Sequence, residues 1–438
     1  MPEPAVNKFR EIVRRNRENG ATGMFSVCSA HPSVLEAAMR QALHDESLLC
    51  IESTSNQVNQ FGGYTGMTPA QFRDYVLVIA HKLVFPSERI LLGGDHLGPY
   101  PWRGEPSQSA LQKARRLVRD CVQAGYTKIH LDASMACADD SGNQISDETV
   151  AARAADLCRA AEDAWATLPN NSPRLVYVIG TEVPVPGGET SGDQGPQPTP
   201  VERMKKTVEI AKRAFIDQEL QDAWERVSGL VVQPGVEFGN DVVFDYEPGK
   251  AAALSANLPG SPALVYEAHS TDYQRPQALR ELVKDHFAIL KVGPWLTFAY
   301  REALFALSRI EREWLRQREG VRLSQVREAL EAAMLRNPGY WKAYYPAHEP
   351  QGHFARQFSY SDRCRYYWPE SSVQKEVDQL LANLSTETIP LNLMSQYLPQ
   401  QYEAVRAGNV QNHPENLVED RIRRVLTLYS SACGSSKD

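Results

Sequence analysis

Two histidines in this sequence each follow an apolar run and stand beside carboxylates. His96 closes the segment GGDH (93–96) after a run of Ile and Leu, and His269 lies in EAHS (267–270) after Leu-Val-Tyr. Two imidazoles and nearby carboxylates around one cavity suit a divalent transition metal that keeps a position open for substrate oxygens. Zn²⁺ is the first expectation, and Mn²⁺, Co²⁺ or Ni²⁺ would also fit, whereas Ca²⁺ prefers oxygen ligands.

A third metal ligand is expected among the carboxylates. Glu237, in the segment QPGVEFG, is the first choice, and Glu182 is the second. Asp95 directly precedes His96, and neighbouring side chains of an extended backbone point to opposite sides. We therefore assign Asp95 to proton transfer as a general acid or base.

Polar side chains also end the other apolar runs. An Asp or Ser at such a position is often only the N-cap of the following helix, and that alternative stays open for several of them. The candidates for substrate binding are Ser29, His31, Glu52, Asp132, Ser134, Ser270, Thr271, Lys291 and Gly293. His130 stands in the middle of the run KIHLD and is interpreted as a structural histidine.

Eight apolar runs, each followed by a segment long enough for a helix, must position these side chains. Buried strands that alternate with helices predict a parallel sheet, and eight units favour an α/β fold of the (β/α)₈ TIM barrel type. In such a barrel the catalytic side chains lie at the C-terminal ends of the strands. The runs are residues 24–29, 48–53, 90–96, 128–134, 174–182, 230–235, 263–270 and 288–294. Neither GxGxxG nor GxxxxGK[ST] occurs, so no nucleotide cofactor is expected.

The strand pattern stops after about residue 310. We predict a barrel that carries the site over residues 1–310 and a helical C-terminal extension packed on it over residues 311–438. The loop 183–200, rich in Pro and Gly, is a candidate lid. Arg363 and Arg365, in an aromatic segment of the extension, could reach a phosphate, but surface salt bridges are the favoured interpretation.

Composition excludes several classes of protein. The net charge of −7 and pI near 5.9 give no reason to expect nucleic acid or an anionic membrane as a partner. Seven cysteines without a CxxC pair do not resemble a disulfide framework or a zinc ribbon, and no run is long and apolar enough to span a bilayer. We expect a cytoplasmic protein that forms a homo-oligomer.

Longer motifs around these residues resemble one known family, the GatZ/KbaZ-type Z subunits associated with tagatose-1,6-bisphosphate aldolase. The motifs run from about residue 26 to beyond residue 398 and include SAHP (29–32), ESTSNQVNQFGGYTGMTP (52–69), GGDHLGP (93–99), KIHLDASM (128–135), IGTEVPVPGG (179–188), VVQPGVEF (231–238), EAHSTDYQ (267–274), ILKVGP (289–294), YSDRCRYYWP (360–369) and SQYLP (395–399).

This resemblance implies a barrel related to class II aldolases. In those enzymes an Asp-His pair after a strand supplies a proton-transfer residue and a zinc ligand, which matches Asp95 and His96. A second zinc histidine at a later strand end matches His269. A closing strand, whose following loop helps to hold a phosphate, matches Lys291, with Gly293 where the aldolases have Asn. The remaining zinc histidine has no counterpart, and Glu237 stands in that region.

The resemblance implies two alternative functions. One is a metal-dependent C4-epimerase that interconverts D-tagatose and D-fructose, free or as 6-phosphates. The other is a non-catalytic subunit that stabilises a separate class II aldolase. The C4 hydrogen of a 2-ketose is not α to the carbonyl, so the epimerase is expected to cleave and re-form the C3–C4 bond. In that scheme Asp95 and Glu182 are expected to exchange a proton with the C4 hydroxyl from either side. Buried charged groups at one rim favour the epimerase, because such groups cost stability unless they pair or bind a metal.

Overall fold

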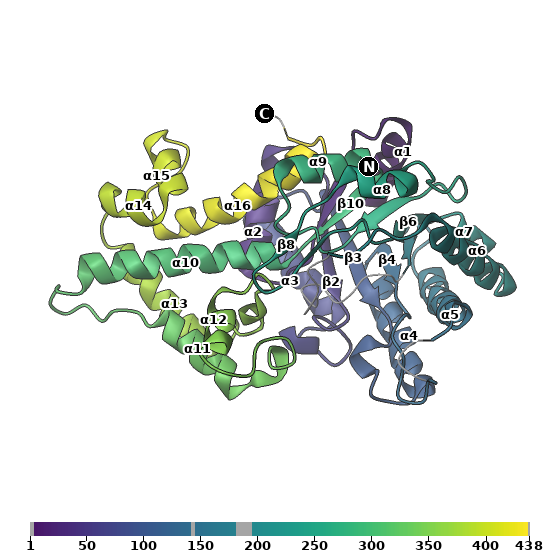
Figure 1. Ribbon diagram of the computed structural model, residues 1–438, viewed down its shortest axis with the longest axis horizontal. Helices are drawn as coiled ribbons and strands as arrows, with labels where there is room; N and C mark the ends of the chain where they lie inside the picture. The colour runs from purple at the N-terminus through teal and green to yellow at the C-terminus, as the bar shows by residue number, and fades with distance from the viewer. Residues whose placement is uncertain (1–3, 142–144, 181–194, 437–438) are drawn as a thin grey trace.

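The computed structural model describes residues 4–141, 145–180 and 195–436. Its centre is a closed barrel of eight parallel strands (Figure 1), joined in the order β1-β10-β9-β6-β5-β4-β3-β2. The barrel strands are β1 (Met24–Val27), β2 (Leu49–Thr54), β3 (Ile90–Leu97), β4 (Lys128–Leu131), β5 (Val176–Ile179), β6 (Val227–Val231), β9 (Val265–Ala268) and β10 (Phe287–Val292). Each of the eight apolar runs overlaps one of these strands, so the predicted (β/α)₈ barrel is confirmed.

Helices cover the outside of the barrel and connect successive strands. This ring consists of α2 (Pro32–His44), α3 (Pro69–Lys82), α4 (Ser107–Gln123), α5 (Asp147–Ala166), α6 (Val201–Asp217), α7 (Gln221–Trp224), α8 (Pro248–Ser255), α9 (Pro276–Lys284) and the first part of α10 (Pro294–Leu315). Many begin with signals that favour a helix start. Thr68 and Gln71 form a capping box at α3, and Pro occupies the first turn of α2, α8, α9 and α10.

An N-terminal helix, α1 (Ala5–Asn19), closes the bottom of the barrel. Its buried side chains Val6, Phe9 and Val13 pack against residues near the starts of the strands, among them Leu91 and Ile289. The amphipathic pattern of the N-terminal segment therefore buries its apolar face against the barrel interior. Because this end is filled, only the opposite mouth, where the strands end, is available for a ligand.

A short antiparallel ribbon, β7 (Glu237–Phe238) and β8 (Val243–Phe244), follows β6 and was not predicted from the apolar runs. The strands have two residues each, too short for a recognisable alternation. The ribbon matters because it holds Glu237, the first choice for the third metal ligand, in a paired and fully buried position.

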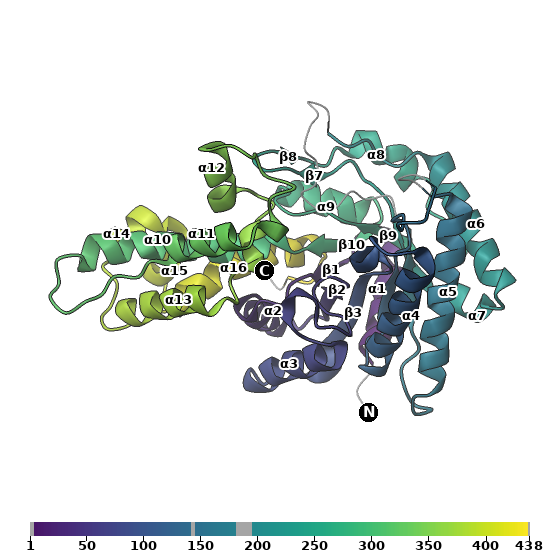
Figure 2. The same cartoon turned by 90° about the horizontal axis from the view of Figure 1, so that it is seen from below.

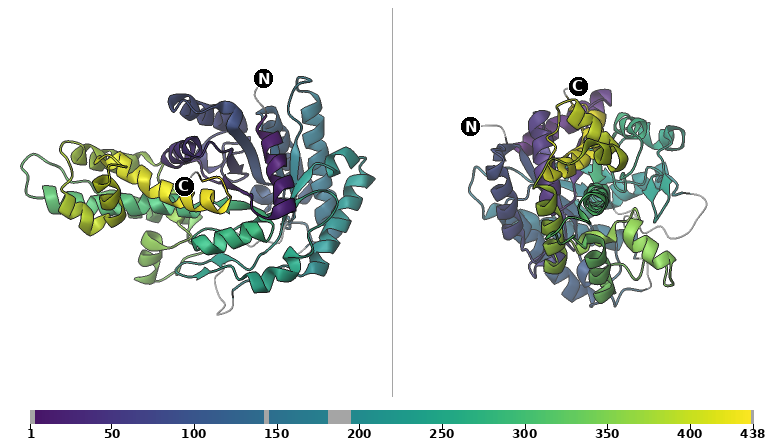
Figure 3. Two further views of the ribbon diagram at one scale, coloured as in Figure 1. Left: turned by 90° about the horizontal axis from the view of Figure 1, so that it is seen from above. Right: turned by 90° about the vertical axis from the view of Figure 1, so that its left-hand side faces the viewer.

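The C-terminal helices project to one side of the barrel, as Figure 2 and the left view of Figure 3 show. They are α11 (Val326–Arg336), α12 (Gln351–Phe358), α13 (Ser371–Leu384), α14 (Leu391–Tyr397), α15 (Pro399–Arg406) and α16 (Pro414–Ala432). Helix α16 returns to the barrel and packs on α10, α2 and α9. Helix α10 continues through residue 310, so the division into two domains stays a prediction.

The structure also contains short 3₁₀ turns: η1 (Gly63–Thr65), η2 (Ser87–Arg89), η3 (Tyr100–Trp102), η4 (Pro338–Tyr340) and η5 (Arg363–Tyr366). Three of them, η1, η3 and η4, place tyrosines around the open mouth of the barrel. The turn η5 brings the aromatic segment of the extension to the same mouth. None of the described helices is long and apolar enough to cross a lipid bilayer.

Candidate functional site

A cavity of about 600 Å³ opens at the C-terminal mouth of the barrel. Strand ends supply Cys28, Asp95, His96, Asp132, Ser134, His269, Ser270 and Lys291 to its wall. The loop after β2 and the C-terminal extension supply most of its aromatic side chains, including Tyr64, Tyr340, Tyr344 and Tyr366. The cavity therefore combines a polar floor on the barrel with an aromatic wall, the usual composition of a small-molecule site.

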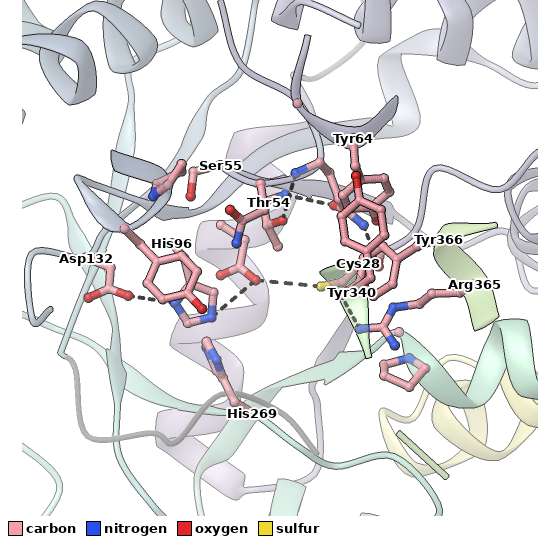
Figure 4. A pocket seen from close by; sticks show the side chains of 18 of the residues that line it. Cys28, Thr54, Ser55, Tyr64, His96, Asp132, His269, Tyr340, Arg365 and Tyr366 are labelled. Carbon is pink, nitrogen blue, oxygen red and sulfur yellow. Dashed lines mark hydrogen bonds and ion pairs between the residues drawn. The ribbon is translucent and has the colours of Figure 1, made fainter. Parts of the chain in front are cut away.

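Four side chains on the floor could hold a metal ion together. Asp95, His96, His130 and His269 each offer a ligand atom, and these atoms all lie within 4.8 Å of one another. Figure 4 shows His96 and His269 pointing toward each other from different strands. Their ring centroids are 4.9 Å apart, and the ring centroid of His130 is 5.0 Å from that of His96.

The backbone at the end of β3 brings Asp95 and His96 to the same side. His96 has a φ of 48°, in the left-handed region, and the pairing of β3 with β4 shifts by one residue between Gly94 and Leu97. This bulge breaks the alternation of side chains. The expectation that Asp95 and His96 diverge was therefore wrong: Asp95 Oδ2 lies 3.8 Å from His96 Nε2.

His130 belongs to this group, contrary to its interpretation as a structural histidine. Its Nδ1 lies 3.2 Å from the backbone nitrogen of His96 and 2.9 Å from Oδ1 of Asp95, and its Nε2 lies 3.3 Å from the carbonyl oxygen of Gly180. The tautomer of the ring decides which of these contacts His130 donates and which nitrogen keeps a lone pair for a metal ion. Lys291 Nζ lies 2.9 Å from the same oxygen of Asp95.

Carboxylates orient the other two imidazoles. His96 Nδ1 and Asp132 Oδ2 are 2.7 Å apart, and His269 Nε2 and Glu267 Oε1 are 3.0 Å apart. A carboxylate on one ring nitrogen fixes the tautomer and leaves the other nitrogen as a ligand, as in many metal sites. This arrangement leaves His96 Nε2 and His269 Nδ1 for the ion.

Burial and charge shift the pKa values in opposite directions. Burial alone would lower the pKa of His96, but the negative charges of Asp95 and Asp132 raise it to about 9. For His269 burial prevails and lowers the pKa to about 4, so this imidazole is neutral at pH 7. Burial would raise the pKa of Asp95, yet the charges of His96 and Lys291 hold it well below its usual range.

Beneath the histidines lies a buried network of charged side chains. Lys128 Nζ contacts Glu52 Oε1 at 2.6 Å and Glu267 Oε2 at 2.7 Å. Lys291 contacts the carboxylates of Glu52, Asp95 and Glu267. With Asp132, this network holds four carboxylates and two ammonium groups. Two of the negative charges have no lysine to balance them. A divalent cation bound by neutral imidazoles would balance these two charges.

The donor set fits a transition metal better than Ca²⁺ or Mg²⁺. Three imidazoles and one carboxylate are ligands typical of Zn²⁺, Mn²⁺, Co²⁺ or Ni²⁺, whereas Ca²⁺ and Mg²⁺ favour oxygen. Glu237, predicted as the third ligand, is not in this group. Its Oε1 accepts the backbone N–H of Phe238 at 2.9 Å, and its Oε2 accepts the hydroxyl of Ser270 at 3.2 Å. In the candidate ligand group, His130 takes the role that was predicted for Glu237.

The remaining predicted residues divide into those that reach the cavity and those that do not. Asp132, Ser134, Ser270, Lys291 and Gly293 line it, whereas Ser29, His31, Glu52 and Thr271 do not. Glu182 and most of the predicted lid lie outside the described residues.

The four that stay outside the cavity have structural surroundings. Ser29 Oγ accepts the backbone N–H of His31 at 3.2 Å, and the ring of His31 packs on Tyr300. Thr271 Oγ1 donates to the carbonyl oxygen of Lys291 at 2.6 Å, and Glu52 belongs to the buried charge network.

Two glycines near the end of β3, Gly93 and Gly98, have a packing role. A Cβ on Gly93 would lie 2.6 Å from Oε1 of Glu52, and a Cβ on Gly98 would lie 1.6 Å from the carbonyl oxygen of Asp132. These positions leave space for the charge network and for the strand that carries Asp132.

Sequence reasoning missed much of the aromatic wall and misjudged the arginines beside it. Tyr340 and Tyr366 stack with centroids 4.8 Å apart, and Tyr64 meets Tyr366 edge-on at 4.8 Å. Arg363 and Arg365 also line the cavity and, among the described residues, make no surface salt bridge.

A closed parallel barrel with a histidine-rich group at its C-terminal mouth defines the class: a TIM barrel protein with a candidate metal site. The chain belongs to the D-tagatose-1,6-bisphosphate aldolase subunit GatZ/KbaZ-like family, whose model matches residues 9–434. The resemblance seen in the sequence motifs is thereby confirmed.

Relatives match over nearly their whole length. A D-tagatose-1,6-bisphosphate aldolase subunit GatZ from Salmonella heidelberg is 49% identical over 425 residues, covering 97% of this chain and 99% of that protein. The subunit of the same name from Klebsiella pneumoniae is 49% identical, with coverage of 98% and 99%. A crystal structure described as a probable tagatose 6 phosphate kinase from Sinorhizobium meliloti superposes with a TM-score of 0.86 at 45% identity, covering 94% of this chain and 100% of that one.

Proposed function

We propose that this protein is a metal-dependent C4-epimerase that interconverts D-tagatose and D-fructose or their 6-phosphates. The observation that carries the proposal is the group of Asp95, His96, His130 and His269, whose ligand atoms lie within 4.8 Å of one another. Asp95, His96 and His269 line the cavity, and His130 is buried beside them. In this proposal the three histidines hold the ion and Asp95 transfers protons. A bound divalent ion would supply Lewis-acid polarisation of the ketose carbonyl.

Inversion at C4 needs a bond to break, because the C4 hydrogen is not α to the C2 carbonyl. Removal of the C4 hydroxyl proton lets the C3–C4 bond break, with its electron pair passing to C3 and the C2 carbonyl. The resulting aldehyde turns, C3 attacks its other face, and the proton returns to the C4 oxygen. Atoms and charge balance without an external oxidant or reductant.

In this proposal Asp95 takes and returns that proton. Its Oδ1 accepts from Lys291, while Oδ2 lies 4.0 Å from Cys28 Sγ, and both Asp95 and Cys28 line the cavity. Burial would raise the pKa of Asp95, but the charge of Lys291 lowers it and favours the ionised form that can accept a proton. We retain Glu182 as the proposed second proton-transfer group because it follows β5 closely in the sequence.

The test is an isomer assay with purified full-length protein after Zn²⁺, Mn²⁺, Co²⁺ or Ni²⁺ has been restored. D-fructose and D-fructose 6-phosphate should each be examined for conversion to the tagatose form. We expect stoichiometric metal and a product of inverted C4 configuration, both lost in His96→Ala. Full turnover by His96→Ala, or an absence of metal binding, would show the proposal to be wrong.

A second candidate function is a non-catalytic subunit of D-tagatose-1,6-bisphosphate aldolase, and the names of the relatives favour it. It predicts that the metal-restored protein alone leaves both ketoses unchanged. It also predicts that the protein co-purifies with a class II aldolase and raises the activity of that enzyme. The two functions therefore give opposite results in the isomer assay.

A further inference from the structure

Two arginines of the C-terminal extension, Arg363 and Arg365, line the cavity without a carboxylate partner. Within residues 4–141, 145–180 and 195–436, neither guanidinium forms an ion pair. Arg365 donates to the backbone carbonyl oxygens of Ser361 and Asp362 and to the hydroxyl of Tyr366 at 2.8 Å. Three of its five N–H groups are thus engaged, and two are left for a ligand.

Arg363 is more deeply buried, with 4% of its surface exposed, and one of its donors is unused. Its Nη1 donates to the carbonyl oxygen of Tyr340 at 3.1 Å, and its guanidinium lies over the ring of Tyr344. Its buried Nε has no hydrogen-bond partner. A buried cation with an unused donor costs stability unless an anion compensates it.

The place where a barrel usually binds phosphate is already filled by the protein. Phosphate commonly lies near the last strands, on the N-terminus of the helix that follows. Here the backbone N–H groups of Gly293 and Trp295, at the start of α10, donate to Oδ1 of Asp272 at 3.0 and 2.8 Å. The hydroxyls of Thr271 and Ser270 also donate hydrogen bonds to protein acceptors. These groups are not free to hold an anion.

The arginines lie across the cavity from the histidines. In Figure 4, His96 and Asp132 are on one side, Arg365 is on the other, and Cys28 lies between them. The rings of Tyr340 and Tyr366 stand next to Arg365 and offer flat apolar faces to the carbon skeleton of a sugar. A ketose with C2 and C3 at the histidines would therefore direct its terminal carbon toward Arg365.

We propose that Arg365, supported by Arg363, forms the phosphate subsite of this cavity, and that the substrate is a ketose phosphorylated at its terminal carbon. This inference rests on the proposed epimerase function. Two guanidinium groups with no carboxylate in ion-pair contact match the two charges of a phosphate monoester, and the planar fork of arginine fits its oxygens in a bidentate contact. A free sugar would bring no negative charge into contact with either guanidinium.

The test compares Arg365→Gln, Arg365→Lys and a control, Arg318→Gln, in metal-restored full-length protein. Arg318 is also in the extension but pairs with Glu387 at the surface, 2.8 Å away. The readout is the ratio of kcat/KM for fructose 6-phosphate to kcat/KM for fructose. We expect Arg365→Gln to lower this ratio by roughly 10- to 100-fold, Arg365→Lys to restore part of it and Arg318→Gln to leave it unchanged. Inorganic phosphate should inhibit the wild type and inhibit Arg365→Gln less.

Three results would overturn the subsite. One is an equal loss for both sugars in Arg365→Gln, a second is a wild-type preference for the free ketose, and a third is a preference for a ketose with a terminal carboxylate. If no sugar is converted although metal is bound, the proposed function fails, and calorimetry then decides the subsite. Binding of fructose 6-phosphate that is tighter than that of fructose and weakened in Arg365→Gln supports it, whereas equal binding by wild type and variant overturns it. Circular dichroism confirms that each variant is folded.

Discussion

Asp95 and His96 are consecutive residues, yet Oδ2 of Asp95 and Nε2 of His96 lie 3.8 Å apart at the mouth of the barrel. An extended strand would point them to opposite faces. The left-handed backbone of His96 and the bulge against β4 bring them together. A non-glycine residue in this region costs about 1 to 3 kcal/mol and often marks a functional site. Ser270, at the end of β9, has the same left-handed backbone with a φ of 52°.

His130→Ala should abolish stoichiometric metal binding. His130 contributes a nitrogen to the candidate ligand group and is only 1% exposed, so no solvent ligand can easily replace it. Loss of an outer-shell partner already costs about 10- to 100-fold in metal affinity, and loss of a ligand should cost at least as much. Metal content by elemental analysis provides the measurement.

The matched control for this variant is His286→Asn. His286 follows α9, away from the mouth, and its Nδ1 lies 3.0 Å from the side-chain oxygen of Asn16. Its replacement should leave the metal content unchanged. If His130→Ala keeps a full complement of metal, His130 is the structural histidine that the sequence suggested.

Asp132→Asn should weaken metal binding by roughly 10- to 100-fold without unfolding the protein. Asp132 Oδ2 is 2.7 Å from His96 Nδ1, so its charge fixes the tautomer that leaves Nε2 for the ion. An asparagine keeps the shape and loses the charge. Competition with a chelator of known affinity measures the change, and Asp139→Asn, an exposed carboxylate in the same loop, is the control. Equal affinities in the two variants would contradict a role for Asp132 in orienting His96.

The fold could be predicted from the sequence because strands of a parallel barrel are buried on both faces and read as apolar runs. The eight runs identified all strands of the barrel. The ribbon β7–β8 was not predicted, because strands of two residues are too short to show an alternation of apolar and polar side chains. The floor of the site was predicted only in part, because the left-handed conformation of His96 is not encoded by a glycine and depends on tertiary packing.

His130 could have been found from the period of two along its strand. In KIHL (128–131), Lys128 and His130 share one face, while Ile129 and Leu131 share the other. Polar side chains at alternate positions of a buried strand indicate that one face points into a polar barrel interior. Glu267 on β9 and His269, the residue after this strand, repeat this pattern. The arginines of the extension had no such signal, since their position depends on contacts between distant parts of the chain.

Lys291→Met should destabilise the fold by about 3 to 5 kcal/mol, because it leaves the buried carboxylates of Glu52, Asp95 and Glu267 short of one positive charge. Urea unfolding in the presence of chelator measures the free energy of unfolding without a contribution from metal. The double variant Lys291→Met/Glu52→Gln should recover part of the loss, since it removes one unpaired charge.

The control for the lysine is Lys82→Met. Lys82 forms an exposed pair with Glu36 at 2.8 Å, and such pairs contribute about 0 to 1 kcal/mol. A loss of less than about 1 kcal/mol in Lys291→Met as well would mean that the buried charges relax without the lysine, and the network would then carry no special stability.

Asp272 should make stability depend on pH between about 4 and 6. Burial raises the pKa of Asp272 to about 6 in the folded protein, from 3.8 for a free side chain. The folded state therefore holds this proton to higher pH than the unfolded state, so the contribution of Asp272 to stability falls as pH rises from about 4 to 6 and is constant above that. Two pKa units correspond to roughly 3 kcal/mol.

Asp272→Asn removes this titration and keeps the hydrogen bonds. Both backbone donors, Gly293 N–H and Trp295 N–H, reach the same oxygen, which an asparagine Oδ1 can replace. Compared with the wild type, the variant should gain little at pH 4 and up to roughly 3 kcal/mol at pH 7, because only the wild type must bury a charge there. Urea unfolding at pH 4, 5, 6 and 7 measures the difference. A difference that does not change with pH would show that Asp272 titrates normally and that the start of α10 holds the carboxylate without an electrostatic penalty.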